Sequence, residues 1–269
     1  MMASETTRPR WLYVPAVLVA IWMAVPPLVV IPMSLNDSRS FSFPPESFSL
    51  RWYREFFTEP TWINSLQASL CIAVQVTLVS VVVGTMASVA LVRGRFFGRR
   101  LVEVLGLAPL VVPLVVFGLG AYALFLNWGL VGTPVGFVAA HTVLAVPYVI
   151  ITVSSSLRTI DTDMERAAAV LGAGPLRVFW RITLPTILPS MLAGGLFAFV
   201  TSFDEVVVAL FISSPDLRTL PVEMYSSVTR DIDPTIAAAS TLILLVSTAL
   251  ILVSTRFVLR SETSERTES

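Results

Sequence analysis

Two adjacent acidic residues, Asp204 and Glu205, stand at the end of a charge-free apolar run that begins after Arg181. An ionised carboxylate at membrane depth is costly and usually marks the pathway of a substrate or an ion. Neighbouring side chains on a helix project about 100° apart, so this pair could not share one proton as a catalytic acid dyad does. We therefore expect Asp204, about 7 Å outward of the middle of its span at helical rise, to meet a cationic solute.

Other roles are open for these residues. Asp204 could cap a helix that is broken after Ser202, or pair with an arginine of a partner subunit. Glu205 could point toward that subunit, because its direction differs from that of Asp204. Ser202 and Phe203 complete this part of the candidate pathway. Phe203 could stack on the methylene chain of a solute, although an aromatic residue in a span also serves plain packing.

His141 and Tyr148 are further candidates for the solute pathway. They lie seven residues apart, which is two turns along one helix face, and Pro147 between them predicts a kink. We expect that face to line the solute cavity. The alternative for His141 is a hydrogen bond between helices, which is a common use of a lone polar residue in a membrane.

The composition is that of an integral membrane protein. Of the 269 residues, 55% are hydrophobic and 13% are charged, and the mean hydropathy is +0.80. Charge-free runs can be compared with the ~20 residues that a helix needs to cross the hydrocarbon core. The run between Glu103 and Arg158 is long enough for two crossings, with turn-forming residues at 132–134. The prediction is an all-α membrane protein with six transmembrane helices, over residues 11–34, 64–92, 102–126, 135–157, 186–212 and 235–258.

The arginines predict the topology, since all 18 basic residues are Arg. Six spans place both termini on the side that holds most of them: Arg8, Arg10, Arg93, Arg95, Arg99, Arg100, Arg158, Arg166, Arg177, Arg181, Arg256, Arg260 and Arg266, against Arg39, Arg51, Arg54, Arg218 and Arg230. That side is the cytoplasm by the positive-inside rule. The short basic loop 93–100 is expected to set this topology and to contact lipid headgroups.

A single transmembrane domain, residues 11–258, is therefore expected between two cytoplasmic ends. Residues 1–10 form the N-terminal end, and the polar tail 259–269 is expected to be disordered. The first span is too long for a signal-peptide core and lacks a small-residue cleavage site after it. We expect it to be retained.

The sequence lacks the residues that several classes of function require. The one cysteine, Cys71, allows no disulfide within the chain, and the one histidine allows no His-rich metal site. Without lysine there is no phosphate-binding loop of the G-x-x-x-x-G-K-[ST] type, and neither H-E-x-x-H nor G-x-S-x-G occurs. We expect no enzymatic site, no metal or cofactor bound by this chain, and no nucleic-acid partner.

Residues 158–185, between the fourth and fifth predicted spans, form the most substantial cytoplasmic element. Gly172 and Pro175 predict two short helices with a sharp reversal between them. Asp161 suits the N-terminus of the first helix, and the small residues 167–169 give it a face that a partner can approach closely. The segment is therefore expected to act as a rigid knob that a soluble partner grips.

This segment resembles the characteristic loop of the membrane subunits of bacterial ABC importers, whose pattern is E-A-A-x-x-x-G, nine residues, then I-x-L-P. The residues that match it with its spacing intact are Ala167, Ala168, Gly172, Ile182, Leu184 and Pro185. Arg166 occupies the place of the pattern's Glu, and Glu165 stands one residue earlier. Whether Glu165 makes the polar contact with the ATPase subunit is left open by this departure.

The resemblance implies the type I importer permease fold and a chain that uses no ATP itself. Two ATP-binding cassette subunits would bind ATP and push such knobs together, while the spans alternate between inward-facing and outward-facing states. A second, homologous permease subunit in a heterodimer and an extracytoplasmic solute-binding protein would complete the complex. Its location would be the bacterial inner membrane.

The chain resembles the spermidine/putrescine branch of these permeases over about residues 10–258, most specifically in its C-terminal third. The segments that carry this resemblance are TSFDEVVVALFISSP at 201–215, TLPVEMYSSVTRDIDPTIAAASTLI at 219–243, FSLRWY at 48–53 and HTVLAVPYV at 141–149. The implied solute is a polyamine, and the acidic pair favours a cation. Relatives with similar loops carry iron(III), thiamine, opines or small amino acid derivatives. A proton-coupled secondary carrier is a further alternative, but it gives the knob no role and expects internal repeats that are not evident here.

Overall fold

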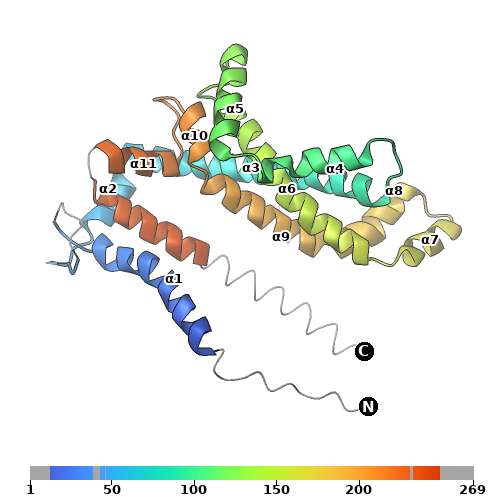
Figure 1. Ribbon diagram of the computed structural model, residues 1–269, viewed down its shortest axis with the longest axis horizontal. Coiled ribbons are helices and arrows are strands. Elements are labelled where there is room, and N and C mark those ends of the chain that lie inside the picture. Colours follow the sequence, from blue (N-terminus) through green and yellow to red (C-terminus); the bar gives the residue numbers. More distant parts are fainter. Residues whose placement is uncertain (1–12, 39–42, 46, 231–232, 249–269) are drawn as a thin grey trace. The chain divides into compact units, whose positions relative to one another are not determined.

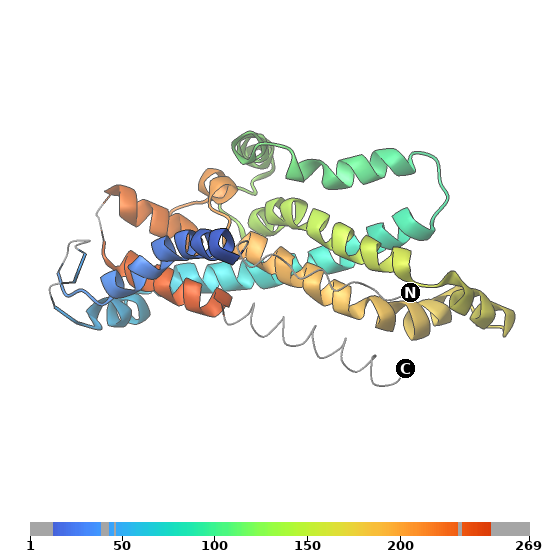
Figure 2. The same ribbon diagram turned by 60° about the horizontal axis from the view of Figure 1, so that its bottom comes forward.

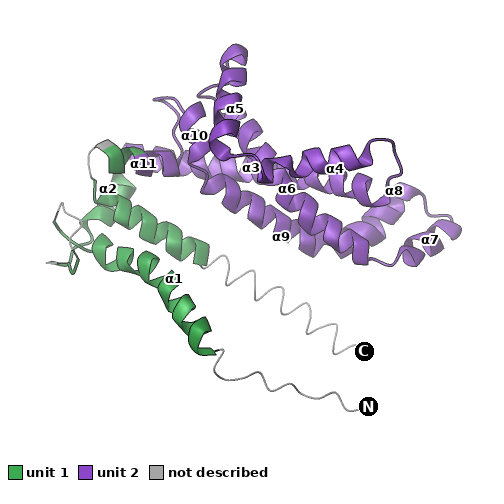
Figure 3. Cartoon of the chain, in the orientation of Figure 1, with its two compact units in different colours: residues 1–59, 226–255 green, residues 60–225, 256–269 purple. Residues whose placement is uncertain are grey.

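The computed structural model describes residues 13–38, 43–45, 47–230 and 233–248. These residues are mostly helical, and the β-structure among them is one isolated bridge between Asn36 and Phe48. The predicted N-terminal end 1–10, the polar tail 259–269 and the last part of the sixth predicted span, 249–258, lie outside the described residues. The chain divides into two compact units, residues 1–59 with 226–255 and residues 60–225 with 256–269 (Figure 3).

The first unit contains helix α1 (Tyr13–Ser34), helix α2 (Arg51–Thr58) and an apolar helix over Thr235–Thr248. The end of α1 is tied to α2 by two polar contacts. The Ser34 and Tyr53 hydroxyls lie 2.7 Å apart, and the Trp52 indole N–H donates to the carbonyl oxygen of Asn36 at 2.6 Å. α1 matches the first predicted span.

The second unit is built on three long helical segments (Figure 1). These are α3 (Pro60–Arg93), α6 (Pro134–Thr159) and a continuous helix that runs through α8 (Pro175–Val178), the π-helical turn η3 (Phe179–Thr183) and α9 (Leu184–Phe203). Contacts between α3, α6 and α9 dominate the unit, and the buried apolar core is centred on α6.

Small residues allow these three helices to approach closely. A Cβ added at Gly84 of α3 would lie 2.6 Å from the Val149 Cβ on α6, and one at Gly194 of α9 would lie 2.5 Å from the Thr152 Oγ1. Close backbone approach through small residues is the usual way that helices associate in membranes, where lipid is as apolar as the helix surface.

The third predicted span, 102–126, is not one straight helix. Helix α4 (Arg99–Leu107) continues into the 3₁₀ turn η2 (Ala108–Leu110), and α5 (Leu114–Trp128) then starts in a direction 104° away. Figure 2 shows this sharp bend. Pro113 stands at the N-cap of α5, and a proline disfavours helical geometry in the residue before it, which accounts for a break here.

The fifth predicted span, 186–212, is also interrupted, which corrects the expectation of one continuous helix. α9 ends at Phe203, and the short helix α10 (Val207–Ile212) begins after a three-residue connection. The last labelled elements are helix α7 (Thr162–Val170), which lies in the segment 158–185, and helix α11 (Leu220–Arg230).

Within the described residues, four helices are long and apolar enough to cross a membrane, namely Tyr13–Ser34, Pro60–Arg93, Pro134–Thr159 and Pro175–Phe203, and the bent pair α4–α5 would make a fifth. Helix Thr235–Thr248 is apolar but shorter within its described part. The all-α membrane class is therefore confirmed, while the count of six stays a prediction.

Candidate functional site

The break between α9 and α10 is stabilised by the Glu205 side chain. Its Oε1 accepts a hydrogen bond from the Val208 backbone N–H, and its Oε2 accepts one from the Ala209 N–H, both at 2.8 Å. The first N–H groups of a helix have no partner within it, so a carboxylate there satisfies donors that would otherwise be orphaned. Glu205 is thus a capping residue inside its own chain, and it is buried.

His141 joins the two sides of this break. Its Nδ1 lies within hydrogen-bonding distance of the Ser202 Oγ, at 3.0 Å, in the last turn of α9. Its Nε2 lies 3.7 Å from the Glu205 Oε2 on the far side of the break. All three side chains are buried, and His141 is fully so. The structure therefore places His141 between the helices rather than on the face of a cavity.

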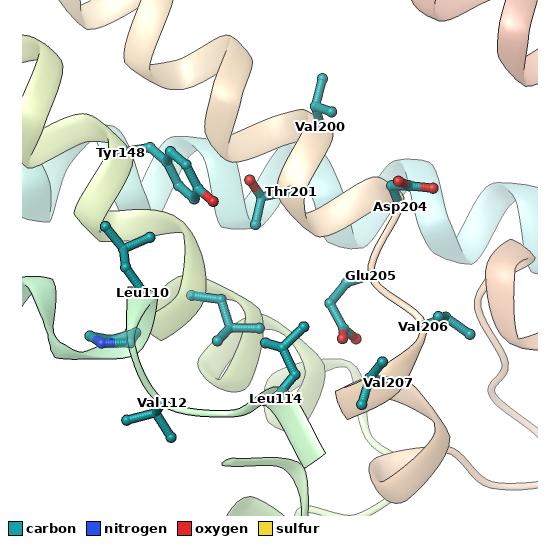
Figure 4. Close-up of a pocket in the computed structure, with 12 residues that line it drawn as sticks. Leu110, Val112, Leu114, Tyr148, Val200, Thr201, Asp204, Glu205, Val206 and Val207 are labelled. Atoms are coloured by element: carbon teal, nitrogen blue, oxygen red, sulfur yellow. The ribbon is translucent and has the colours of Figure 1, made fainter. Parts of the chain in front are cut away.

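Asp204 has the opposite environment. It is the C-cap of α9, its side chain is exposed, and it lines a cavity of about 470 Å³. Figure 4 shows the Asp204 and Glu205 carboxylates pointing in different directions from the connection, with Tyr148 and Thr201 at the cavity wall. The rest of the lining is largely aliphatic and comes from the α4–α5 bend, α6 and the start of α10: Pro109, Leu110, Val112, Leu114, Leu144, Val200, Val206 and Val207.

The two aromatic candidates have separate positions. Tyr148 lines the cavity and stacks on Phe197 of α9, with ring centroids 6.2 Å apart. Phe203 stacks on Phe199 one turn earlier, at 5.6 Å, and is not among the lining residues. The structure thus brings Asp204, Glu205 and Tyr148 to the cavity, and Phe203 packs within its own helix. The part played by the α4–α5 bend was not anticipated, although Pro109 and Pro113 are a sequence signal for it.

The segment 158–185 contains the expected reversal. Asp161 caps α7 by accepting from the Asp163 backbone N–H at 2.9 Å, and Gly172 adopts a left-handed φ of +87° just after the helix. This φ is favourable for glycine and strained for other residues. The second helix does not stop, however, because α8 continues through η3 into α9. The reversal therefore leads directly into the long helix that ends at Asp204.

The residues of the importer pattern differ in exposure. Ala167 and Pro185 are exposed, and Ala168, Ile182 and Leu184 are half-buried. Arg166 points outward and pairs with Asp163 at 3.0 Å, both side chains being 76% exposed. Glu165 instead turns inward, where its Oε1 accepts from Arg93 at 3.2 Å and from the Thr183 hydroxyl at 2.9 Å. Sequence reasoning missed Arg93 and Thr183 as its partners.

In the part of the chain that the structure describes, no group of three or more His, Cys, Asp or Glu side chains could hold a metal ion. The polar features of the site are therefore the carboxylates described above, the imidazole and the hydroxyls. They can bind and orient a charged solute, and they can hold a helix break in a fixed shape.

The chain thus has an interrupted apolar helix beside a cavity and a sharp reversal at the start of the same long helix. The model of the family described as "Binding-protein-dependent transport system inner membrane component" matches residues 80–262. The chain belongs to this family, and it is an inner-membrane permease subunit of the ABC importer class.

Two curated relatives transport polyamines. The chain is 36% identical over 244 residues to the putrescine transport system permease protein PotI of Escherichia coli K12, covering 88% of this chain and 86% of that protein. It is 30% identical over 228 residues to the spermidine/putrescine transport system permease protein PotC of the same strain, covering 84% and 85%.

Other relatives have different solutes. The molybdenum transport system permease protein ModB of Mycobacterium bovis is 33% identical over 260 residues, covering 91% of this chain and 92% of that protein. Among solved structures, a bacterial ABC transporter involved in the import of the acidic polysaccharide alginate gives a TM-score of 0.68 at 17% identity, covering 97% of this chain and 99% of that one. That likeness concerns the fold.

Proposed function

We propose that this chain is a permease subunit of an ATP-driven importer of polyamines, with putrescine and spermidine as the expected solutes. The observation that carries the proposal is the presence of Asp204 and Glu205 among the lining residues of a cavity whose other walls are mainly aliphatic, with the Asp204 side chain exposed. A polyamine alternates ammonium groups with methylene chains. The ammonium groups of such a solute need an anionic contact, and its methylene chains need apolar walls.

The electrostatics of the cavity favour a cation over an anion. No Arg is among the lining residues, and the chain contains no Lys. An acidic solute such as alginate would meet Asp204 without a compensating positive charge from this chain. The printed names of the putrescine and spermidine/putrescine relatives support the same choice.

We assign direct solute contact to Asp204 and Tyr148. Ser202, His141 and Glu205 hold the helix break that presents Asp204, and Phe203 packs beside it on α9. Under this assignment Asp204 and Tyr148 touch the solute. The other residues of the predicted pathway support the helix break that presents Asp204.

The proposed topology has six spans with both termini in the cytoplasm, residues 11–258 forming the transmembrane domain. The proposed partners are two ATP-binding cassette subunits, a second homologous permease and an extracytoplasmic solute-binding protein. In support, one solved relative is an alginate ABC transporter in complex with a ligand-bound periplasmic protein, with a TM-score of 0.69 at 15% identity. ATP is used by the cassette subunits, and this chain binds no cofactor.

Coupling is proposed to pass through residues 158–185. Three large apolar side chains at the reversal are strongly exposed in this chain, namely Val170 at 87%, Leu171 at 88% and Leu176 at 74%. Such a patch on a cytoplasmic element is typical of an interface. Closure of the cassette subunits on ATP would displace it, and the long helix from Pro175 to Phe203 would transmit the displacement toward Asp204.

Uptake of radiolabelled solute by cells that express the complete complex tests the proposal. ATP-dependent uptake of putrescine or spermidine, and none of molybdate, is the expected result. If the complex hydrolyses ATP but takes up neither polyamine, the solute assignment is wrong and the importer class remains.

A further inference from the structure

One carboxylate oxygen connects three separate elements at the cytoplasmic end of the second unit. Glu165 lies on α7, Arg93 is the last residue of α3, and Thr183 is the last residue of the π-helical turn η3. The Glu165 Oε1 accepts from the Arg93 Nη2 at 3.2 Å and from the Thr183 Oγ1 at 2.9 Å. We call this set of three side chains the Glu165 clasp.

The clasp is shielded from water more than the other charged pair on α7. The side chains of Arg93 and Glu165 are 25% and 20% exposed, and Thr183 is buried. The Asp163–Arg166 pair on the same helix is 76% exposed on both sides. Exposed pairs are screened by solvent and contribute little, whereas hydrogen bonds to a charged and partly buried group are among the stronger ones.

Apolar side chains do not fill the space between α7 and the end of α3, where the clasp lies. A cavity of about 390 Å³ lies beneath α7, with Val89 of α3, Ala169 of α7 and Phe179 of η3 among its lining residues. Arg93, Glu165 and Thr183 line the same cavity. Since side chains on facing helices do not fill this space, the polar contact is the direct bridge from α7 to the end of α3.

We propose that Glu165 is a positioning residue that fastens the coupling helix α7 to α3 and to the long helix Pro175–Phe203, and that it does so without touching the ATPase subunit. This inference rests on the proposed role of residues 158–185 as the ATPase contact. The clasp makes α7 move together with α3 and η3, so a push on the exposed apolar patch shifts both helices and not the reversal alone.

Through Thr183, the clasp is attached to the long helix at an irregular turn. It ends a π-helical turn, and such turns are interruptions of regular helix that often occur at functional positions. Thr183 is followed by twenty residues of α9 that end beside Asp204. Holding α7 at this turn therefore connects the coupling helix to the part of α9 that carries the solute site.

The test compares Glu165→Gln with Asp163→Asn in the complete, purified complex. Both variants turn a carboxylate into an amide on α7, but only the first alters the clasp. Two quantities are measured: hydrogen exchange of the α7 backbone amides without solute, and solute molecules transported per ATP hydrolysed. For Glu165→Gln we expect faster exchange in α7 and a transport ratio lower by about tenfold, the order of one hydrogen bond to a charged group. Asp163→Asn should leave the exchange of the α7 amides at the wild-type rate.

Exchanging the charges of Arg93 and Glu165 provides a rescue experiment. Arg93→Glu and Glu165→Arg should each raise α7 exchange alone, and the double variant should return it toward the wild-type rate. Unchanged exchange in Glu165→Gln, or faster exchange with an unchanged transport ratio, would overturn the proposal. If the wild type transports no polyamine, the exchange data still decide whether the clasp exists, so a wrong solute assignment is distinguishable from a wrong clasp.

Discussion

Asp204 and Glu205 line the same cavity but differ in environment: Asp204 is exposed, while Glu205 is buried and caps the next helix. The difference arises because α9 ends between them and α10 begins three residues later. Both Glu205 carboxylate oxygens accept hydrogen bonds from backbone N–H groups of α10. We propose that the Asp204 carboxylate contacts the solute.

Removing the Glu205 side chain is expected to destabilise the permease. Glu205→Ala leaves the buried N–H groups of Val208 and Ala209 without acceptors, at a cost of about 1–3 kcal/mol each. The thermal midpoint of the detergent-solubilised complex should fall, and less complex should assemble. Glu205→Gln keeps one acceptor oxygen and should give a smaller loss.

The contrast with Asp204 decides how this result is understood. Asp204→Asn should leave the thermal midpoint unchanged, because its side chain is exposed. A Glu205→Ala complex that is fully stable but inactive would mean that Glu205 contacts the solute, contrary to the role assigned to it here.

The two glycines of the reversal in residues 158–185 offer a matched comparison. A Cβ at either Gly172 or Gly174 would meet nothing within 4 Å, so substitution causes no clash. Gly172 has a φ of +87°, whereas Gly174 has a φ of −67° and a ψ of 159°, which any residue adopts before proline. Gly172→Val should therefore strain the reversal by at least about 1–2 kcal/mol, the cost of left-handed geometry.

The expected consequence is uncoupling. Gly172→Val should lower uptake relative to ATP hydrolysis while the chain remains inserted in the membrane, and Gly174→Val should behave as the wild type. Equal effects of the two substitutions would show that the left-handed turn at Gly172 is not what matters.

The topology can be tested with single cysteines, since Cys71 is the only one in the chain. In a Cys71→Ala background, Phe97→Cys lies in the basic loop at a fully exposed position and Asp216→Cys lies in an exposed loop after α10. A membrane-impermeant maleimide applied to spheroplasts should label Asp216→Cys. It should label Phe97→Cys, and a cysteine at Ser261, only after permeabilisation. Labelling of Phe97→Cys in intact spheroplasts would invert the proposed orientation.

Much of the architecture follows from local sequence signals. Charge-free runs bounded by arginine predicted α1, α3 and α6, because the length of an apolar helix is set by the bilayer. Gly172 and Pro175 predicted the reversal, since each has a conformational preference of its own. These signals depend on few neighbours, so they can be recognised without a structure.

A break after Ser202 with Asp204 as its cap is one of the alternatives that the sequence offers, and the structure has the break one residue later, with Asp204 as the C-cap. The apolar pattern, which continues through Val206–Ile212, does not by itself predict this break. The contact of Ser202 with His141, 61 residues away, is seen only in the packed structure. The Glu165 clasp is similar, because Arg93 is 72 residues away in the sequence. A charged residue at the end of a span, such as Arg93, predicts the topology of the chain. Only the packed structure shows that its side chain also pairs with Glu165.

The central claim is that Asp204 presents a carboxylate to a cationic solute. The most direct test is uptake of radiolabelled putrescine and spermidine by proteoliposomes that contain the complete complex, comparing the wild type with Asp204→Asn and with Asp216→Asn as an exposed control. We predict that Asp204→Asn loses most of its uptake, about tenfold or more as for loss of a charged hydrogen-bond partner, while its assembly and thermal midpoint are retained. Wild-type uptake by a stable Asp204→Asn complex would contradict the claim.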